Sequence, residues 1–183
     1  MTNAITNEVK MVRFKIGDII LIPMTEGKFG IARVLNKLRR GTVVLFELFA
    51  MPLLPEEEIN YKEIVKNNPS LIQWAFGQKI KSGHWKVIGN VKVDFPIDMP
   101  MVVNSTIMPD GSLRYFKRKS LYDAPLECEG EWITVDKSEY TKNPHPDMPF
   151  PVALKIQYIN YLKNMGYVDE IPEDTSVFQD YPI

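Results

Sequence analysis

The apolar pattern near the start of the chain predicts a β-hairpin followed by a third strand. Residues 19–22 form a continuous apolar run, which suits a strand covered on both faces. Pro23 has no backbone N–H to donate, so this strand should stop there or lie on an edge. Gly27 then marks the turn. We expect strands at about residues 14–23, 29–36 and 42–50.

The return strand of this hairpin has one face of small residues. Gly30, Ala32 and Val34 share that face, because side chains alternate along a strand, and larger residues share the other. A small face and a large face together favour a tightly bent sheet.

The middle of the chain predicts helix and then short strands. Residues 56–81 are expected to be mainly helical, with a break at Pro69 and a second helical segment from Ser70. The segment 83–89 marks the return to strand. Pro109-Asp110-Gly111 is a turn between strands at 101–107 and 112–116, and residues 132–135 predict one more short strand.

The last helix has the clearest pattern. Pro151 suits the first helical position, and Gly166 suits the stop. The expected apolar stripe is Val152, Ile156, Ile159, Leu162 and Met165.

These elements together predict an α+β fold. We expect a strongly curved, mainly antiparallel, barrel-like sheet of about six to eight strands, with two or three helices packed against it. Residues 1–12 are expected to be a flexible leader, 13–166 a single domain, and 167–183 an acidic C-terminal tail.

Composition predicts the cellular compartment of the protein and shows that charge is distributed unevenly along the chain. The 183 residues are 45% hydrophobic and 25% charged, and the longest apolar runs fall short of the roughly 18 residues that span a bilayer. The N-terminus has no apolar core of signal-peptide type, and a single cysteine excludes an intramolecular disulfide, so we expect a cytosolic protein. Residues 1–92 carry 14 Lys+Arg against 8 Asp+Glu, whereas residues 93–183 carry 8 against 15. Such asymmetry can steer an oppositely charged partner.

The residues with chemical potential are few and scattered. His84 and His145 are far apart, and no spacing typical of a zinc site is present. Cys128 lies between two glutamates, which should raise the pKa of its thiol and make it a poor nucleophile. No nucleophile elbow and no phosphate-binding loop is present. We therefore assign no catalytic residue, no metal ligand and no cofactor.

Several short motifs, taken in order, resemble the immunity protein 26 family. The first is the strand with Gly17-Asp18 that ends in Pro23, and the second is the turn with Gly27 and Gly30, followed by Arg33-Val34. The third is the segment Gly83-His84-Trp85-Lys86-Val87-Ile88-Gly89, and a later run around Asp110-Gly111 is similar to the final hairpin of that family. Physical roles also fit these residues: Gly17 and Gly27 can supply positive φ, Asp18 can bond a turn backbone, and Trp85 can fill one end of a barrel.

The resemblance implies a bacterial antitoxin of a polymorphic toxin system. Such a protein is not an enzyme and blocks a cognate toxin in the cytoplasm by covering its active surface. A nuclease is one candidate toxin, because an acidic surface could mimic the charge of its substrate. We select as partner-binding residues Tyr167, Asp169, Glu170, Glu173, Asp174 and Tyr181.

Two alternatives remain open from the sequence. One is a small barrel-like module that binds nucleic acid or a peptide, for which Lys117-Arg118-Lys119 is the best phosphate patch, although the net charge of −1 argues against a general nucleic-acid binder. The other is a small-molecule hydrolase, which would need a pocket with a perturbed histidine or carboxylate.

Overall fold

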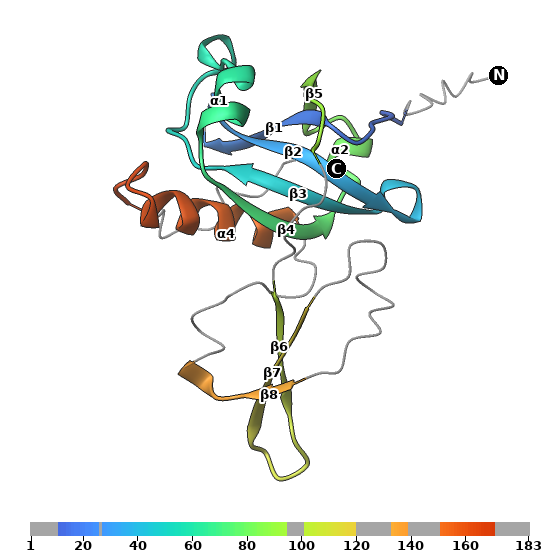
Figure 1. Cartoon of the computed structure of the whole chain (residues 1–183), viewed down its shortest axis with the longest axis vertical. Helices are drawn as coiled ribbons and strands as arrows, with labels where there is room; N and C mark the ends of the chain where they lie inside the picture. Colours follow the sequence, from blue (N-terminus) through green and yellow to red (C-terminus); the bar gives the residue numbers. More distant parts are fainter. Residues whose placement is uncertain (1–10, 26, 95–100, 120–132, 139–150, 171–183) are drawn as a thin grey trace, which may run out of the picture.

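The centre of the protein is an open antiparallel sheet of five strands. A computed structural model describes residues 11–25, 27–94, 101–119, 133–138 and 151–170. The strand order is β4-β3-β2-β1-β5 (Figure 1). The bounds are β1 Asp18–Thr25, β2 Lys28–Leu38, β3 Val43–Phe49, β4 Ser70–Phe76 and β5 Lys86–Asn90.

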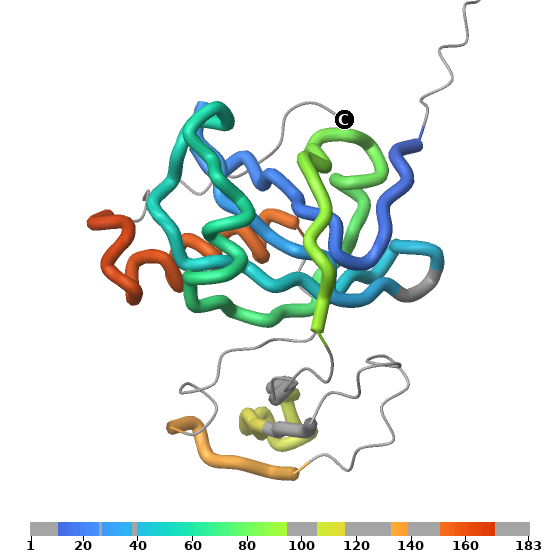
Figure 2. Tube along the Cα trace, turned by 45° about the horizontal axis from the view of Figure 1, so that its top comes forward, coloured from blue at the N-terminus to red at the C-terminus, as the bar shows by residue number. Residues whose placement is uncertain are grey.

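A second antiparallel sheet of three strands follows in the sequence. Its order is β6-β7-β8, and Figures 1 and 2 show it beside the five-stranded sheet and not within it. Its strands are β6 Met101–Ile107, β7 Leu113–Lys119 and β8 Ile133–Val135. The β6–β7 hairpin is confirmed. Its turn is closed by Gly111 at φ +80° and by Asp110, whose side chain accepts from the backbone N–H and the hydroxyl of Ser112, and these hydrogen bonds lower the pKa of that carboxyl.

Three α-helices and two short 3-10 turns complete the described chain. The bounds are η1 Arg39–Gly41, η2 Glu56–Glu58, α1 Tyr61–Asn67, α2 Gln78–Lys81 and α4 Pro151–Asn164. The α+β class is therefore confirmed. The barrel-like closure is not, because β4 and β5 are the two separate edges of the large sheet among the described residues.

The five-stranded sheet is buried on both faces. On one face, Ile20 and Ile22 join a cluster with Leu154 and Leu162 of α4. On the other, Ile19 and Leu21 join a cluster that includes side chains of α1. The continuous apolar run of β1 therefore serves two cores, as its pattern predicted. Beyond Leu21, β1 pairs only with β2, so Pro23 lies on a locally unpaired edge and the strand continues past it to Thr25.

The small face of β2 makes room for a helix. Gly30 lies under the ring of Tyr158, and a Cβ added at Gly30 would stand 2.3 Å from Cε1 of that ring. From the sequence, we expected the small residues of β2 to permit a tight bend of the sheet. Their role in the structure is a different one. They let α4 approach the sheet backbone closely.

The hydroxyl of Tyr158 forms hydrogen bonds with two backbone groups of β2 and β3 that the strand ladder leaves unpaired. The β2–β3 ladder ends at the pair Ala32 and Leu48. Just beyond it, the buried Tyr158 hydroxyl accepts from the backbone N–H of Ile31 at 3.1 Å and donates to the backbone carbonyl of Phe49 at 2.6 Å. Two backbone groups that the ladder leaves behind thereby gain a partner inside the core.

The buried face of α4 differs from the predicted stripe. Its fully buried positions follow the i, i+3, i+4 spacing around Leu154 and Tyr158, whereas Met165 is 42% exposed. Val152 and Ile156 are only partly buried. The predicted ends are confirmed, because Pro151 opens the helix and Gly166 follows it at φ +77°. The predicted stripe is confirmed at Ile159 and Leu162 and was wrong at Met165. The close contact between Gly30 and Tyr158 turns the Tyr158 side of the helix toward the sheet.

The helix predicted from Ser70 onward was wrong. Residues 70–76 form β4, which pairs in regular antiparallel register with β3 from Phe49↔Ser70 to Val43↔Phe76. A short helix, α2, follows only after Gly77. The apolar residues of 71–76 fit helical spacing equally well, and pairing with the long apolar strand β3 decided the outcome.

Replacing Tyr158 by phenylalanine should destabilise the fold measurably. Tyr158→Phe keeps the ring but leaves the Ile31 N–H and the Phe49 carbonyl without the hydroxyl, so we expect a loss of about 1–3 kcal/mol in the free energy of unfolding. Urea unfolding followed by circular dichroism measures it. Tyr161→Phe, on the partly buried side of the same helix, is the matched control and should change little. Equal stability of the two variants would contradict the role of the hydroxyl.

The same hydroxyl predicts a pH dependence in alkaline solution. Burial raises the pKa of Tyr158 well above its ordinary value of 10.0, so the folded protein keeps the proton while the unfolded chain loses it. The contribution is therefore complete below pH 10.0 and is lost as the pH rises above it. The stability difference between wild type and Tyr158→Phe should shrink by about 1.4 kcal/mol per pH unit above that point. A constant difference in urea unfolding across that range would refute this linkage.

Candidate functional site

The Gly17-Asp18 motif is a turn that ties three strands together. Gly17 adopts φ +87°, donates its N–H to Val34 and accepts from the N–H of Val91. Asp18 accepts from the backbone N–H of Lys15 at 2.8 Å and from the side-chain amide of Asn90 at 2.8 Å. The predicted positive φ of Gly17, that of Gly27 and the turn role of Asp18 are all confirmed.

The tryptophan motif is also structural. Trp85 is fully buried and its ring meets that of Phe46 edge-on, with ring centroids 6.0 Å apart. Gly89 lies against Tyr61 of α1, where an added Cβ would meet the tyrosine ring at 2.5 Å. Both residues therefore serve the packing of β5. Trp85 is too deeply buried to contact a ligand, and Gly89 has no side chain.

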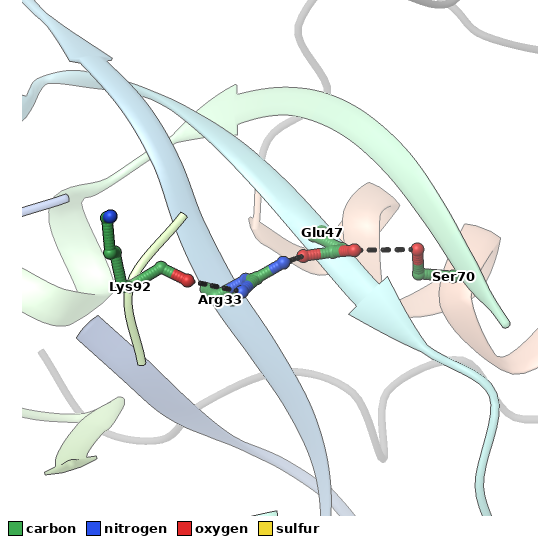
Figure 3. Close-up of polar contacts among 4 residues, drawn as sticks. All are labelled: Arg33, Glu47, Ser70 and Lys92. Atoms are coloured by element: carbon green, nitrogen blue, oxygen red, sulfur yellow. Dashed lines mark hydrogen bonds and ion pairs between the residues drawn. The ribbon is translucent and has the colours of Figure 1, made fainter. Parts of the chain in front are cut away.

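A largely buried ion pair lies on the sheet face that α1 partly covers. Arg33 on β2 donates Nε to Glu47 on β3 at 2.7 Å and donates Nη1 to the backbone carbonyl of Lys92 at 2.9 Å (Figure 3). Ser70 on β4 donates its hydroxyl to the other oxygen of Glu47 at 2.9 Å. The guanidinium also lies 6.0 Å from the ring centroid of Phe49.

This polar cluster organises the sheet and does not suit catalysis. Both oxygens of Glu47 accept a hydrogen bond, and the side chains of Arg33 and Glu47 are only 13% and 14% exposed. The carboxylate is thus engaged by a permanent cation and a hydroxyl, with no imidazole or thiol among the four residues to exchange a proton. Sequence reasoning noted Arg33 only as part of a strand motif and missed its partners.

The predicted partner-binding residues are placed only in part. Tyr167 is 38% exposed just after α4, and Asp169 and Glu170 are exposed beside it. Glu173, Asp174 and Tyr181 lie outside the described residues. The three described residues lie close together in sequence, around Val168, which packs against the core.

The described residues offer little for a chemical reaction. In them, no cluster of three or more His, Cys, Asp or Glu side chains could hold a metal ion. Ser82 Oγ lies 2.7 Å from Nδ1 of His84, but this contact stands on the exposed α2–β5 turn. Cys128 and His145 lie outside the described part of the chain. None of the described helices is long and apolar enough to cross a bilayer.

Sequence reasoning missed a basic cavity. A cavity of about 1050 Å³ lies between the first described residues, the end of β2, η1 and α2. Its charged lining residues come from three separate stretches of the sequence: Arg13, then Lys37 and Arg40, then Lys81. No motif links them. The basic pair at residues 39–40 was the one available signal, and we interpreted it as part of a linker.

The comparison with known families agrees with the motifs. Residues 15–102 match the family model described as immunity protein 26. Over this segment, a little under half of the chain, the sequence is similar to the immunity protein 26 family. The matched segment contains the complete five-stranded sheet, with the motifs at Gly17 and Trp85, whereas α4 lies beyond it. No curated protein and no solved structure matches the chain.

The buried ion pair should be energetically coupled. A double-mutant cycle of Arg33→Ala and Glu47→Ala should give a coupling energy of about 2 kcal/mol, because breaking a desolvated, hydrogen-bonded pair leaves the other charge without its partner. Lys86 and Glu56 form the matched control pair, with side chains 61% and 43% exposed. The control cycle should give at most about 0.5 kcal/mol. Equal couplings from urea unfolding would refute the assignment.

Proposed function

We propose that this protein is a non-enzymatic immunity protein that binds a cognate bacterial toxin in the cytoplasm and covers its active surface. The match of residues 15–102 to the immunity protein 26 family model is the observation that carries this proposal. The motif residues support it as well, because Gly17, Asp18, Trp85 and Gly89 are all used for folding. A scaffold whose motifs stabilise it is suited to present a surface.

The proposed toxin-binding surface is the turn that follows α4, here called the α4 turn, residues 165–170. Met165 and Tyr167 are 42% and 38% exposed, and Asp169 and Glu170 are exposed beside them. An aromatic anchor next to carboxylates is a typical arrangement for recognition of a basic protein. Glu173, Asp174 and Tyr181 extend the proposed surface along the chain.

The α4 turn is held in place from both sides, which favours binding. The Tyr167 N–H donates to the carbonyl of Leu162, and Gly166 takes the positive φ that this helix ending needs. Val168 packs against the core between the exposed Tyr167 and Asp169. A surface that is already ordered loses little conformational entropy on binding.

The charge of this surface indicates the kind of toxin. Negative charge attracts a cationic surface, and a nuclease carries one to hold the phosphates of its substrate. We therefore propose a toxin with a basic active surface, with a nuclease as the first candidate.

The test uses, as the candidate toxin, the protein encoded by the gene that neighbours this one in its host. Wild type should protect cells that express the toxin and should form a complex with it. The variant Tyr167→Ala/Asp169→Asn/Glu170→Gln should associate about tenfold more slowly at low salt, because both steering charge and the anchor are lost. Stopped-flow fluorescence measures the rate.

The matched control removes two exposed carboxylates elsewhere. Glu57→Gln/Glu58→Gln changes the net charge equally on η2 and should leave the association rate within about twofold of wild type. An unchanged rate for the α4-turn variant would exclude that surface from the interface. Failure of the wild type to bind or protect would reject the immunity function itself.

A further inference from the structure

The basic cavity is lined by three separate stretches of the chain. Phe14 forms its buried floor, and the backbone N–H of Val12 donates to the carbonyl of Lys81 at 2.9 Å, which fixes the first described residues beside α2. Lys37 contributes from β2 and Arg40 from η1. The cavity therefore rests on the main sheet, on the end of it where the β2–β3 connection and α2 meet.

The four cations of this cavity have no anionic partner among the described residues. The ammonium of Lys37 donates to the backbone carbonyl of Phe14 and lies 5.2 Å from the centroid of its ring. The ammonium of Lys81 donates to the hydroxyl of Thr42 at 3.2 Å. Both partners are neutral, and in the described chain neither Arg13 nor Arg40 forms an ion pair. Within the part of the chain that the structure describes, no carboxylate neutralises the four cations that line this cavity.

The loop that carries Arg40 is held in an unusual backbone conformation. Arg40 has φ +56°, the only positive φ found for a non-glycine residue among those described, and Gly41 follows at φ +82°. A left-handed conformation is strained for an arginine and persists only where its surroundings hold it. Here the N–H of Gly77 donates to the carbonyl of Thr42, and Gly77 lies so close to Gly41 that an added Cβ would meet its carbonyl at 2.5 Å. The position of Arg40 is therefore built into the fold.

We propose that this cavity binds a phosphate-bearing ligand of about nucleotide size. Its volume of about 1050 Å³ is at the upper end of cavities that hold small ligands, roughly 300–1,000 Å³. Arginine and lysine together are the side chains that bind phosphate oxygens, arginine through two parallel donors and lysine as a point charge. Met11 and Val12 supply an apolar wall next to them, on which a base can rest.

The charge density favours phosphate over an acidic peptide. A diphosphate or triphosphate group concentrates several negative charges in a small volume, as a cavity lined by four cations favours, whereas a peptide carries one charge per acidic side chain. The proposal is independent of toxin binding, because the α4 turn shares no residue with the cavity lining.

Isothermal titration calorimetry of the full-length chain tests the proposal with three probes at low salt: pyrophosphate, ATP and a ten-nucleotide oligothymidylate. We expect ATP to bind, and Arg13→Ala/Arg40→Ala to raise its Kd about tenfold or more, as expected for lost charge-assisted hydrogen bonds. Both arginines are exposed, so the variant should fold, and circular dichroism checks it. The matched control, Lys28→Ala/Lys92→Ala, removes two exposed cations outside the cavity and should change the Kd less than about twofold.

The outcomes separate the sources of the phosphate. Tighter binding of ATP than of the oligonucleotide assigns the site to a free nucleotide, and the reverse order assigns it to a nucleic-acid backbone; both support a phosphate site. Citrate serves as a carboxylate probe of comparable charge. Citrate affinity equal to that of pyrophosphate, equal losses in both variants, or no binding of any phosphate probe would each overturn the proposal.

Discussion

The contact between Tyr158 and Gly30 is the constraint on which the packing of α4 against the five-stranded sheet depends. A ring can reach the backbone of β2 only where a residue lacks a side chain, and its hydroxyl then satisfies backbone groups at the point where β2 and β3 part. This contact sets the position of α4 over one face of the sheet. The helix in turn closes the larger apolar cluster and places the residues that follow it at the surface.

The other face of the sheet is organised by polar contacts. The Arg33–Glu47 pair joins β2 to β3, reaches β4 through Ser70 and reaches the segment after β5 through a backbone carbonyl. Apolar clusters lie on both sides of it. A largely buried ion pair in which both carboxylate oxygens accept a hydrogen bond adds a directional restraint to the apolar packing of this face.

Local patterns were enough to predict most strands, the last helix and the roles of individual turn residues. Gly17, Gly27 and Asp18 could be interpreted correctly because a positive φ or a turn hydrogen bond depends on neighbouring residues. Residues 70–76 could not, because their conformation depends on the partner strand β3. Met165 was predicted to be buried and is exposed, and Tyr158 was not part of the predicted stripe, because a glycine on a distant strand decides which side of the helix is covered. The cavity cations come from three stretches of the sequence that meet only through the fold.

The position of α4 has a consequence for synthesis of the chain. All five strands of the main sheet precede Lys92, whereas the helix that covers one side of them is made only after the second sheet. During translation that side, with Ile20, Ala32 and Phe46, lacks its helix α4 until residues 151–164 have left the ribosome. The nascent protein therefore passes through a stage at which chaperones can recognise its exposed apolar face. Only a chain translated beyond Leu162 can bury that face.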